Sequence, residues 1–265
     1  MFLSDESKLL FFHVPKVAGS SIHAFLKEKY NKWHIPDTLP PIHHIRVKDY
    51  LKYNPDKIDY FKFSFVRNPF ERLLSAYSDY TQIRITPQQD KDYFLKHNLI
   101  DKEKLDKSLS VYRKFYYDEN HNFSSYKEFC NYCTGGNIYP NQEIHLLKNP
   151  DFLFINKGET FEDFCEKFVE SGWSKDIHFI PQTEILCDNS GKLLVDYVGR
   201  HETINNDLSK LSNILGYPIE LNNPKFKGVS RKTNHLHYSQ VYNDRTRKIV
   251  ENVFKNDLEL FNYSF

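Results

Sequence analysis

Two short stretches of this sequence carry residue types that bind phosphate groups. The first, HVPKVAGSS, covers residues 13–21 and places Lys16 shortly before a glycine and two serines. The start of a helix favours an anion through its backbone N–H groups and its dipole, and a glycine lets the ligand approach closely. We therefore predict a phosphate site made of Lys16, Ala18, Gly19, Ser20 and Ser21, with a simple helix cap as the alternative.

The second stretch, FVRNPFERLLSAY, covers residues 65–77 and suits another phosphate group. Arg67 follows an apolar run, and a guanidinium can hold a phosphate through two parallel hydrogen bonds. Ser75 lies two helical turns further on and offers a hydroxyl donor. The alternatives are a salt bridge from Arg67 to Glu71 and a small residue at a helix crossing for Ser75.

These stretches differ from those of an ATP-dependent phosphotransferase. Lys16 precedes the glycine, whereas a Walker lysine follows it, and the second strand ends in Arg67 where a Mg²⁺-binding aspartate is common. Cys130 and Cys133 could form half of a zinc site, but no second close pair completes it. We predict no metal.

The alternation of strands and helices predicts an α/β protein with a mostly parallel, doubly wound sheet, whose ligands bind where strands end and helices begin. We predict a single domain over residues 1–265, with a polar, partly helical insertion over residues 82–150 that contributes to the acceptor site. Apolar runs predict strands at residues 9–14, 60–66, 152–155, 178–186 and 193–198. Helical spacing predicts helices at residues 22–30, 69–80, 160–171 and 202–215 and in the tail from residue 238.

Composition limits the choice of partners and compartment. Lys and Arg number 36 against 35 for Asp and Glu, so the overall charge indicates neither nucleic acid nor an anionic membrane as a partner. The amino terminus lacks the features of a secretory signal, and no apolar run reaches the roughly 18 residues of a membrane span. The 4 cysteines fit a reducing cytosol. We expect a cytoplasmic protein.

The two phosphate stretches resemble the donor-binding motifs of sulfotransferases that use 3′-phosphoadenosine 5′-phosphosulfate (PAPS). They are most similar to those of Golgi-type heparan and chondroitin sulfotransferases and their bacterial relatives. The segments FIPQTEIL, VDYVGRHE and FKNDLELFNYSF extend the resemblance over most of the chain outside the insertion. The resemblance implies a P-loop-like three-layer fold with a central mostly parallel sheet, PAPS as donor and no metal.

The resemblance also assigns roles to residues. Lys16 would contact the phosphosulfate bridge, with the glycine and serines behind it on the 5′-phosphate. Arg67 and Ser75 would bind the 3′-phosphate. Arg231 and Lys232, in the segment SRKT before the last helix, would add positive charge at the adenosine end.

Sulfuryl transfer needs a base for the acceptor hydroxyl and a cation for the leaving phosphate oxygen. Lys16 suits the second role. For the base, the sequence offers the adjacent imidazoles of His43 and His44. We choose His44 because its spacing to Asp49 and Tyr50 resembles that at the catalytic histidine of the uronosyl 2-O-sulfotransferase branch. The alternative is a pair of surface histidines.

Other polar and aromatic residues have weaker assignments. We expect His13 to pack at a strand end and His23 to lie on a helix surface. Arg46, Lys48 and Arg84 could bind a carboxylate or sulfate of an acceptor sugar. Insertion tyrosines could stack on sugar faces or simply pack: Tyr112, Tyr116, Tyr117 and Tyr139.

The function predicted from the sequence is PAPS-dependent O-sulfation of a glycan or glycolipid, with acidic glycans among the acceptors. A bacterial cytoplasmic enzyme is our expectation, and the catalytic part of a Golgi enzyme is the alternative. Two other functions stay open: an ATP-dependent phosphotransferase, and a nucleotide- or glycan-binding module without turnover.

Overall fold

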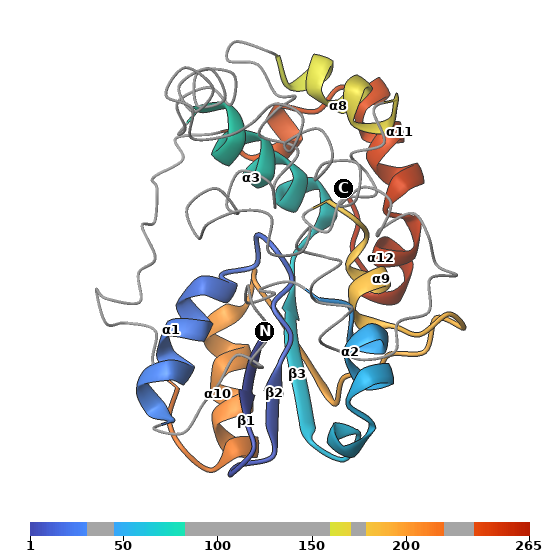
Figure 1. Cartoon of the computed structure of the whole chain (residues 1–265). Coiled ribbons are helices and arrows are strands. Elements are labelled where there is room, and N and C mark those ends of the chain that lie inside the picture. The colour runs from blue at the N-terminus through green and yellow to red at the C-terminus, as the bar shows by residue number, and fades with distance from the viewer. Residues whose placement is uncertain (31–44, 83–159, 171–178, 220–235) are drawn as a thin grey trace, which may run out of the picture.

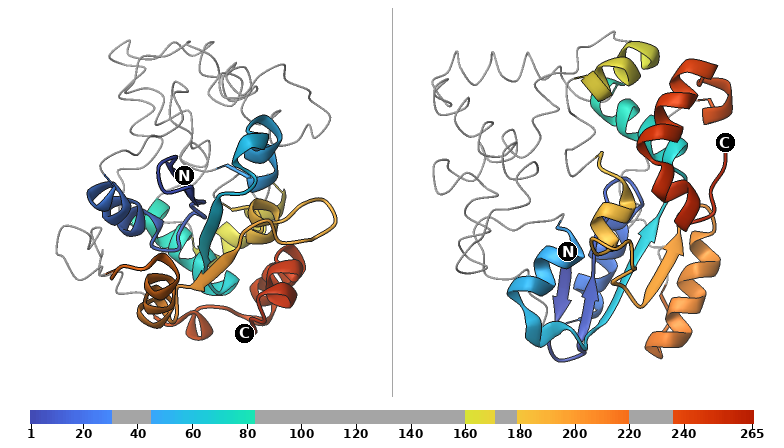
Figure 2. Two further views of the ribbon diagram at one scale, coloured as in Figure 1. Left: turned by 90° about the horizontal axis from the view of Figure 1, so that it is seen from below. Right: turned by 90° about the vertical axis from the view of Figure 1, so that its right-hand side faces the viewer.

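The computed structural model describes residues 1–30, 45–82, 160–170, 179–219 and 236–265. These segments form a sheet with helices on both of its faces and further helices beyond one end of its strands (Figure 1). Seen from below, α1 and α10 lie on one side of the sheet and α2 and α9 on the other (Figure 2). The predicted three-layer α/β architecture is confirmed.

The sheet has the order β1-β2-β3-β4, with β1 (Phe2–Ser4) antiparallel to β2 (Leu9–Phe11). Strands β2, β3 (Phe61–Val66) and β4 (Tyr197–Arg200) run parallel to one another. Their register aligns Phe11 with Phe63 and Phe63 with Tyr197. Because their carboxyl ends meet at one edge, the segments that follow these strands lie together. The mostly parallel sheet was predicted; β1 was not.

The helices follow in chain order. They are α1 (Gly19–Lys29), α2 (Val47–Tyr53), α3 (Pro69–Gln82), α8 (Phe161–Glu170), α9 (Gln182–Leu186), α10 (Ile204–Leu215), α11 (Asp244–Val253) and α12 (Lys255–Leu260). Two 3₁₀ helices cover Pro55–Lys57 and Tyr238–Gln240. Helix α3 starts as predicted, with Pro69 at its first position and the side chain of Asn68 accepting a hydrogen bond from the N–H of Phe70 at 3.0 Å.

The strand predicted over residues 178–186 is wrong, because residues 179–181 form a turn and an irregular segment and Gln182–Leu186 is helix α9. Apolar Ile185 and Leu186 fit either structure, and here the N–H groups of Gln182 and Thr183 bind the carboxylate of Asp257 instead of a neighbouring strand. The strand predicted over residues 193–198 starts later, at Tyr197, after an isolated bridge between Cys187 and Leu193. The predicted strand over residues 152–155 and most of the insertion lie outside the described residues.

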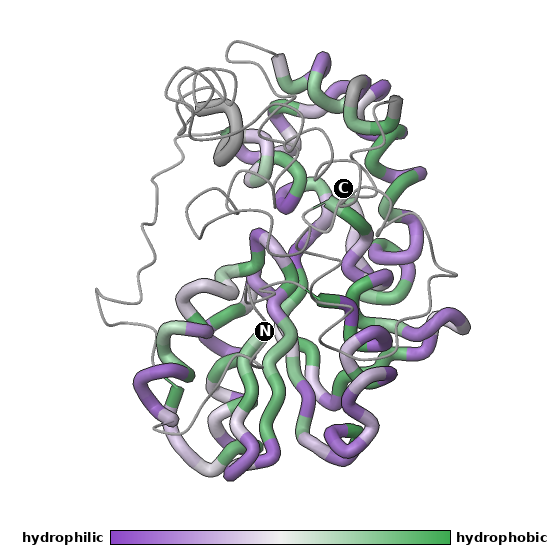
Figure 3. The backbone as a smooth tube through the Cα atoms, in the orientation of Figure 1, coloured by the Kyte–Doolittle hydropathy of each residue, from purple (hydrophilic) through white to green (hydrophobic). Residues whose placement is uncertain are grey.

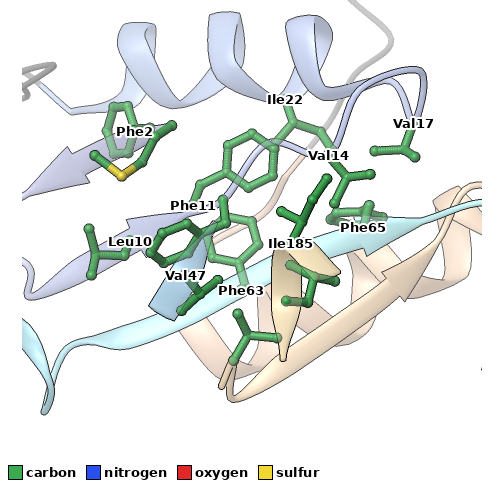
Figure 4. Packing of buried hydrophobic residues seen from close by; sticks show 14 of the residues in the cluster. Phe2, Leu10, Phe11, Val14, Val17, Ile22, Val47, Phe63, Phe65 and Ile185 are labelled. Carbon is green, nitrogen blue, oxygen red and sulfur yellow. The ribbon is translucent and has the colours of Figure 1, made fainter. Parts of the chain in front are cut away.

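Two apolar clusters hold these layers together. The first joins the sheet to the helices on its two faces, with the rings of Phe11 and Phe63 stacked at 5.0 Å and with Ile22, Val47 and Ile185 packed around them (Figure 4). The second joins α3, α8 and the C-terminal helices through Phe70, Phe164, Phe168, Phe179 and Phe254. Hydrophobic residues are concentrated in the central strands, whereas the surrounding helices alternate between hydrophobic and hydrophilic residues (Figure 3).

A buried carboxylate links the C-terminal helices to this framework. Asp257 on α12 is fully buried. One of its oxygens accepts the N–H of Gln182 at 2.8 Å, and the other accepts the N–H and the hydroxyl of Thr183 at 2.8 and 2.9 Å. Burial raises the pKa of Asp257, while the positive charge of Arg72 opposes that shift. The start of α9 is therefore fixed by a residue some 75 positions further along the chain.

We expect Asp257→Ala to lower the free energy of unfolding by about 3 kcal/mol, because it leaves two buried N–H groups without an acceptor. Urea unfolding followed by circular dichroism measures the change. The matched control is Glu259→Ala on the same helix, whose carboxylate is exposed and should matter by less than about 0.5 kcal/mol. Equal unfolding midpoints for the two variants would contradict the assigned role of Asp257.

Candidate functional site

The loop between β2 and α1 has the backbone shape of an anion-binding turn. Lys16 and Ala18 both have left-handed conformations, with φ of 69° and 62°. For a residue other than glycine this conformation costs about 1–2 kcal/mol, so it occurs only where the surrounding structure imposes it. Such residues are often found at ligand sites.

Helix α1 continues this arrangement. The carbonyl of Ala18 accepts the N–H groups of Ser21 at 3.0 Å and of Ile22 at 3.2 Å. The N–H groups of Gly19 and Ser20 come before these, where a helix has no acceptor of its own. The predicted serine cap is wrong: Ala18 is the capping residue, without a side-chain hydrogen bond, and both serines lie inside the first turn. The N–H groups of Gly19 and Ser20 and the hydroxyl groups of the two serines are therefore the donors suited to an anion.

The structure explains why residue 19 is a glycine, and the sequence did not indicate this explanation. A Cβ atom at this position would lie 1.8 Å from Cδ2 of His13, so the imidazole ring fills the space that a side chain would need. His13 also stacks on Phe11, with ring centroids 6.0 Å apart. The expected packing of His13 at the strand end is confirmed, and it fixes the first turn of α1 against the end of β2.

Arg67, at the end of β3, connects the two phosphate stretches. Its Nη1 donates to the carbonyl oxygen of Lys16 at 3.2 Å, and its Nη2 donates to Oε1 of Glu71 at 2.9 Å. The salt bridge considered as an alternative is thus present, but so is a direct contact between segments 51 residues apart. Burial lowers the pKa of Arg67, and the carboxylate of Glu71 opposes that shift.

The backbone of Arg67 is held by a side chain that the sequence analysis gave no role. The amide of Gln182 accepts the N–H of Arg67 at 2.9 Å and donates to its carbonyl oxygen at 2.8 Å. Gln182 in turn is fixed by Asp257. In the sequence analysis its segment, FIPQTEIL, was noted only for its family resemblance. The full burial of Gln182 became visible only in the structure.

Glu202 and the C-terminal residues hold the next position, Asn68. Glu202 accepts the N–H of Asn68 at 2.7 Å and the hydroxyl of Tyr263 at 2.9 Å. The side-chain amide of Asn68 donates to the carbonyl oxygen of Ser264 at 3.0 Å. The segments VDYVGRHE and FKNDLELFNYSF therefore support the strand end that carries Arg67.

Arg72 ties the loop to α3 from inside the protein. Its Nε donates to the carbonyl oxygen of Pro15 at 3.2 Å, and both Nη atoms donate to that of Ile180 at 3.0 Å. Burial lowers the pKa of Arg72 to about 10, with Asp257 opposing. The side chain is only 2% exposed, so its role is to position backbone, not to meet a ligand.

His201 lies close enough to Arg67 to be influenced by its charge, and Ser75 lies on the same helix as Glu71. The N–H of His201 donates to the carbonyl oxygen of Val66 at 2.8 Å, which places His201 at the end of β4. Burial, and next the positive charge of Arg67, lower the pKa of His201 to about 4. Ser75 is half-buried on α3, four residues after Glu71 and hence on the same side of the helix.

Several predicted site residues lie outside the described residues, and their roles stay predictions. These are the histidines considered as the base and the cations assigned to the adenosine end and the acceptor: His43, His44, Arg84, Arg231 and Lys232. The same holds for Cys130, Cys133 and the insertion tyrosines Tyr112, Tyr116, Tyr117 and Tyr139.

Arg46 and Lys48 line a hollow of about 430 Å³ between α2 and the turn at residues 188–190. Nε of Arg46 lies 2.5 Å from a carboxylate oxygen of Asp49, and Nζ of Lys48 donates to Oδ1 of Asn189 at 2.6 Å. Two of the three cations predicted to bind an acceptor therefore line one pocket. Arg46 pairs with Asp49 on the same helix, and Lys48 binds Asn189 on the opposite side of the pocket.

Other features of the described segments bear on the type of site. They contain no cluster of His, Cys, Asp and Glu that could hold a metal ion. In that same part of the chain no helix is long and apolar enough to cross a bilayer.

Cys165 and Cys187 are buried free thiols, and burial raises the pKa of Cys187 to about 11. His23 is half-buried and meets the ring of Phe2 edge-on at 6.1 Å, so it is less exposed than expected.

Comparison with known proteins identifies the class. The profile of the sulfotransferase family matches residues 1–264, and the chain therefore belongs to this family. Carbohydrate sulfotransferase 11 of Danio rerio is 22% identical over 284 residues, covering 100% of this chain and 67% of the relative. The protein of that name from Rattus norvegicus is 23% identical over 281 residues, with the same coverage. No solved structure matches significantly.

The family resemblance predicted from the two phosphate stretches is confirmed by these matches, and with it the class of enzyme, a sulfotransferase. The single-domain organisation and the bacterial, cytoplasmic location stay predictions.

The low pKa of His201 makes stability depend on pH. Because this pKa is about 4 in the folded protein and its ordinary value is 6.5, the folded state binds fewer protons between these values. The contribution of His201 to the free energy of unfolding is fully present above pH 6.5. It decreases by about 2 kcal/mol as the pH falls toward 4. Urea unfolding from pH 7.5 to 4.5 should show a flatter profile for His201→Phe than for the wild type. Parallel profiles would exclude His201 as a source of the pH dependence.

Proposed function

We propose that the protein transfers a sulfuryl group from PAPS to a hydroxyl group of a carbohydrate. Membership of the sulfotransferase family supports the reaction type, and the relatives named carbohydrate sulfotransferase support the acceptor class. The observation that carries the proposal is the hydrogen bond from Arg67 to the carbonyl oxygen of Lys16. Through it, two separate phosphate-binding elements form one site.

The donor assignment follows from the distribution of charge on PAPS, which has a phosphosulfate at the 5′ position and a phosphate at the 3′ position of one ribose. The loop before α1 and the first N–H groups of that helix, which have no intrahelical acceptor, fit the 5′ group. Arg67 and Ser75, on the neighbouring strand end and helix, fit the 3′-phosphate. Arg231 and Lys232 remain our candidates for the adenosine end.

The reaction needs one proton acceptor and one cation from the protein. In the proposed mechanism the imidazole of His44 takes the proton of the sugar hydroxyl while the hydroxyl oxygen forms its bond to sulfur. The bond between sulfur and the bridging oxygen breaks, and the ammonium group of Lys16 offsets the negative charge that this oxygen acquires. PAPS supplies the activated sulfuryl group, so the protein has only to orient the reactants and neutralise charge.

The acceptor we propose is a sugar hydroxyl of a glycan or glycolipid, acidic glycans included. The hollow beside α2 supports a sugar site, because Arg46, Lys48, Asp188 and Ser190 surround it with both donors and acceptors. Arg46 comes two positions after His44 in the sequence. In this proposal the pocket binds polar groups of the acceptor.

Calorimetric titration with PAP, the desulfated donor, tests the donor site. We expect binding without Mg²⁺, unchanged when Mg²⁺ is added, and weakened at least about thirtyfold in Arg67→Ala, since a charge-assisted bidentate contact contributes roughly 2–3 kcal/mol. Arg245→Ala on α11, an exposed arginine paired with Glu166, is the control and should bind like the wild type. Mg²⁺-dependent ATP binding with no PAP binding would instead indicate a phosphotransferase.

Transfer of radioactive sulfate from PAPS to a panel of oligosaccharides tests the catalytic roles. His44→Ala and Lys16→Ala should each lower kcat by about 10² to 10³-fold, because each removes a group that acts mainly in the transition state. PAP affinity should stay unchanged in His44→Ala. His43→Ala is the control, and full loss of transfer there with retained activity in His44→Ala would reverse our choice of base. PAP binding without transfer by the wild type to any acceptor would favour a binding module.

A further inference from the structure

Glu71 is a half-buried glutamate in the proposed donor site, and the proposed mechanism gives it no part. It lies in the first turn of α3, four residues after Arg67, and accepts from Nη2 of that residue at 2.9 Å. The side chains of Arg67 and Glu71 are only 12% and 19% exposed. A carboxylate so close to a predicted phosphate site needs an explanation, because the two anions repel each other.

The geometry of the pair shows that it is only half formed. Nε and Nη2 make up one edge of the guanidinium plane, and an anion that binds this edge takes both N–H groups. Glu71 takes only Nη2. Nε of Arg67 and Oε2 of Glu71 are both buried and have no hydrogen-bond partner among the described residues. Glu71 thus occupies half of the edge that a phosphate would use, and the other half is vacant.

The other hydrogen bonds of Arg67 hold it in place without Glu71. Nη1 donates to the carbonyl oxygen of Lys16, a backbone contact that joins the two phosphate elements. The backbone of Arg67 is fixed by Gln182. Arg67 therefore does not depend on Glu71 for its position, whereas a buried guanidinium does need a counter-charge.

We propose that Glu71 is the resident counter-ion of Arg67 in the ligand-free protein and that the 3′-phosphate of the donor displaces it. This inference rests on the proposed function. Glu71 stabilises the empty site and weakens binding of every nucleotide that carries a 3′-phosphate, the product PAP included. It is a residue that sets affinity and specificity for the donor, and it takes no part in the chemical step.

The test is Glu71→Gln, which keeps an oxygen acceptor for Nη2 and removes the charge. Calorimetry should give about tenfold tighter binding of PAP, since a competing, partly buried charge is gone. Binding of adenosine 5′-phosphate, which lacks the 3′-phosphate, should stay within twofold of wild type by the same estimate. Without ligand, the variant should melt at a lower temperature than the wild type.

Two matched variants support the comparison. Glu251→Gln removes the carboxylate of the similar pair with Arg247, four residues apart on α11, and should change neither affinity nor specificity. In the double variant Arg67→Ala/Glu71→Gln, the tighter binding caused by Glu71→Gln should disappear. If Glu71→Gln does not fold, Glu71→Asp, whose shorter side chain withdraws the charge, should tighten PAP binding by a smaller factor.

Unchanged or weaker PAP binding in Glu71→Gln would overturn the inference, because Glu71 would then be neutral or would help Arg67 to bind phosphate. Equal tightening for PAP and adenosine 5′-phosphate would also overturn it, because the effect would not involve the 3′-phosphate. These outcomes leave the proposed function intact as long as the wild type binds PAP. Absence of PAP binding by the wild type would refute the proposed function and this inference together.

Discussion

The carboxylate of Asp257 fixes the place where the two stretches predicted to bind phosphate meet. It holds the start of α9 by two backbone N–H groups, and Gln182 in that helix holds the backbone of Arg67. The guanidinium of Arg67 then reaches the carbonyl oxygen of Lys16. This series of hydrogen bonds runs from the second apolar cluster, through the edge of the sheet, to the loop before α1. A parallel sheet alone would bring the strand ends together, but it would not fix the distance between the two loops.

The polar side chains around the end of β3 differ in how far their hydrogen bonds are satisfied by the described residues. Both carboxylate oxygens of Asp257 accept hydrogen bonds from described residues. The side-chain oxygen and nitrogen of Gln182 are likewise both hydrogen-bonded. Nε of Arg67 and Oε2 of Glu71, by contrast, are buried without partners in those segments. Buried polar groups are almost always paired in folded proteins, so such atoms indicate a ligand or a second state. The left-handed residues Lys16 and Ala18 lie beside them.

The sequence was sufficient for the elements whose causes are local. Apolar runs located β2 and β3, and Asn68-Pro69 located the start of α3. The sequence was insufficient where a contact with a distant residue determines the local structure. Nothing near Gln182 indicates that its N–H binds Asp257, so a helix was taken for a strand, and the ring of His13 explains Gly19 better than ligand access does. Arg67 could be predicted as a site residue because a motif needs only residue type and position, and its role stays a prediction. The residues that support it, such as Gln182 and Asp257, are defined only by their contacts.

The contacts of Asn68 have a consequence for the order in which the protein can be assembled. Its side chain binds the carbonyl oxygen of Ser264, and its neighbour in the site, Glu202, binds the hydroxyl of Tyr263. Asn68 and Ser264 are 196 positions apart in the sequence. During translation the strand that carries Arg67 therefore gains these contacts only once Tyr263 and Ser264 have been synthesised.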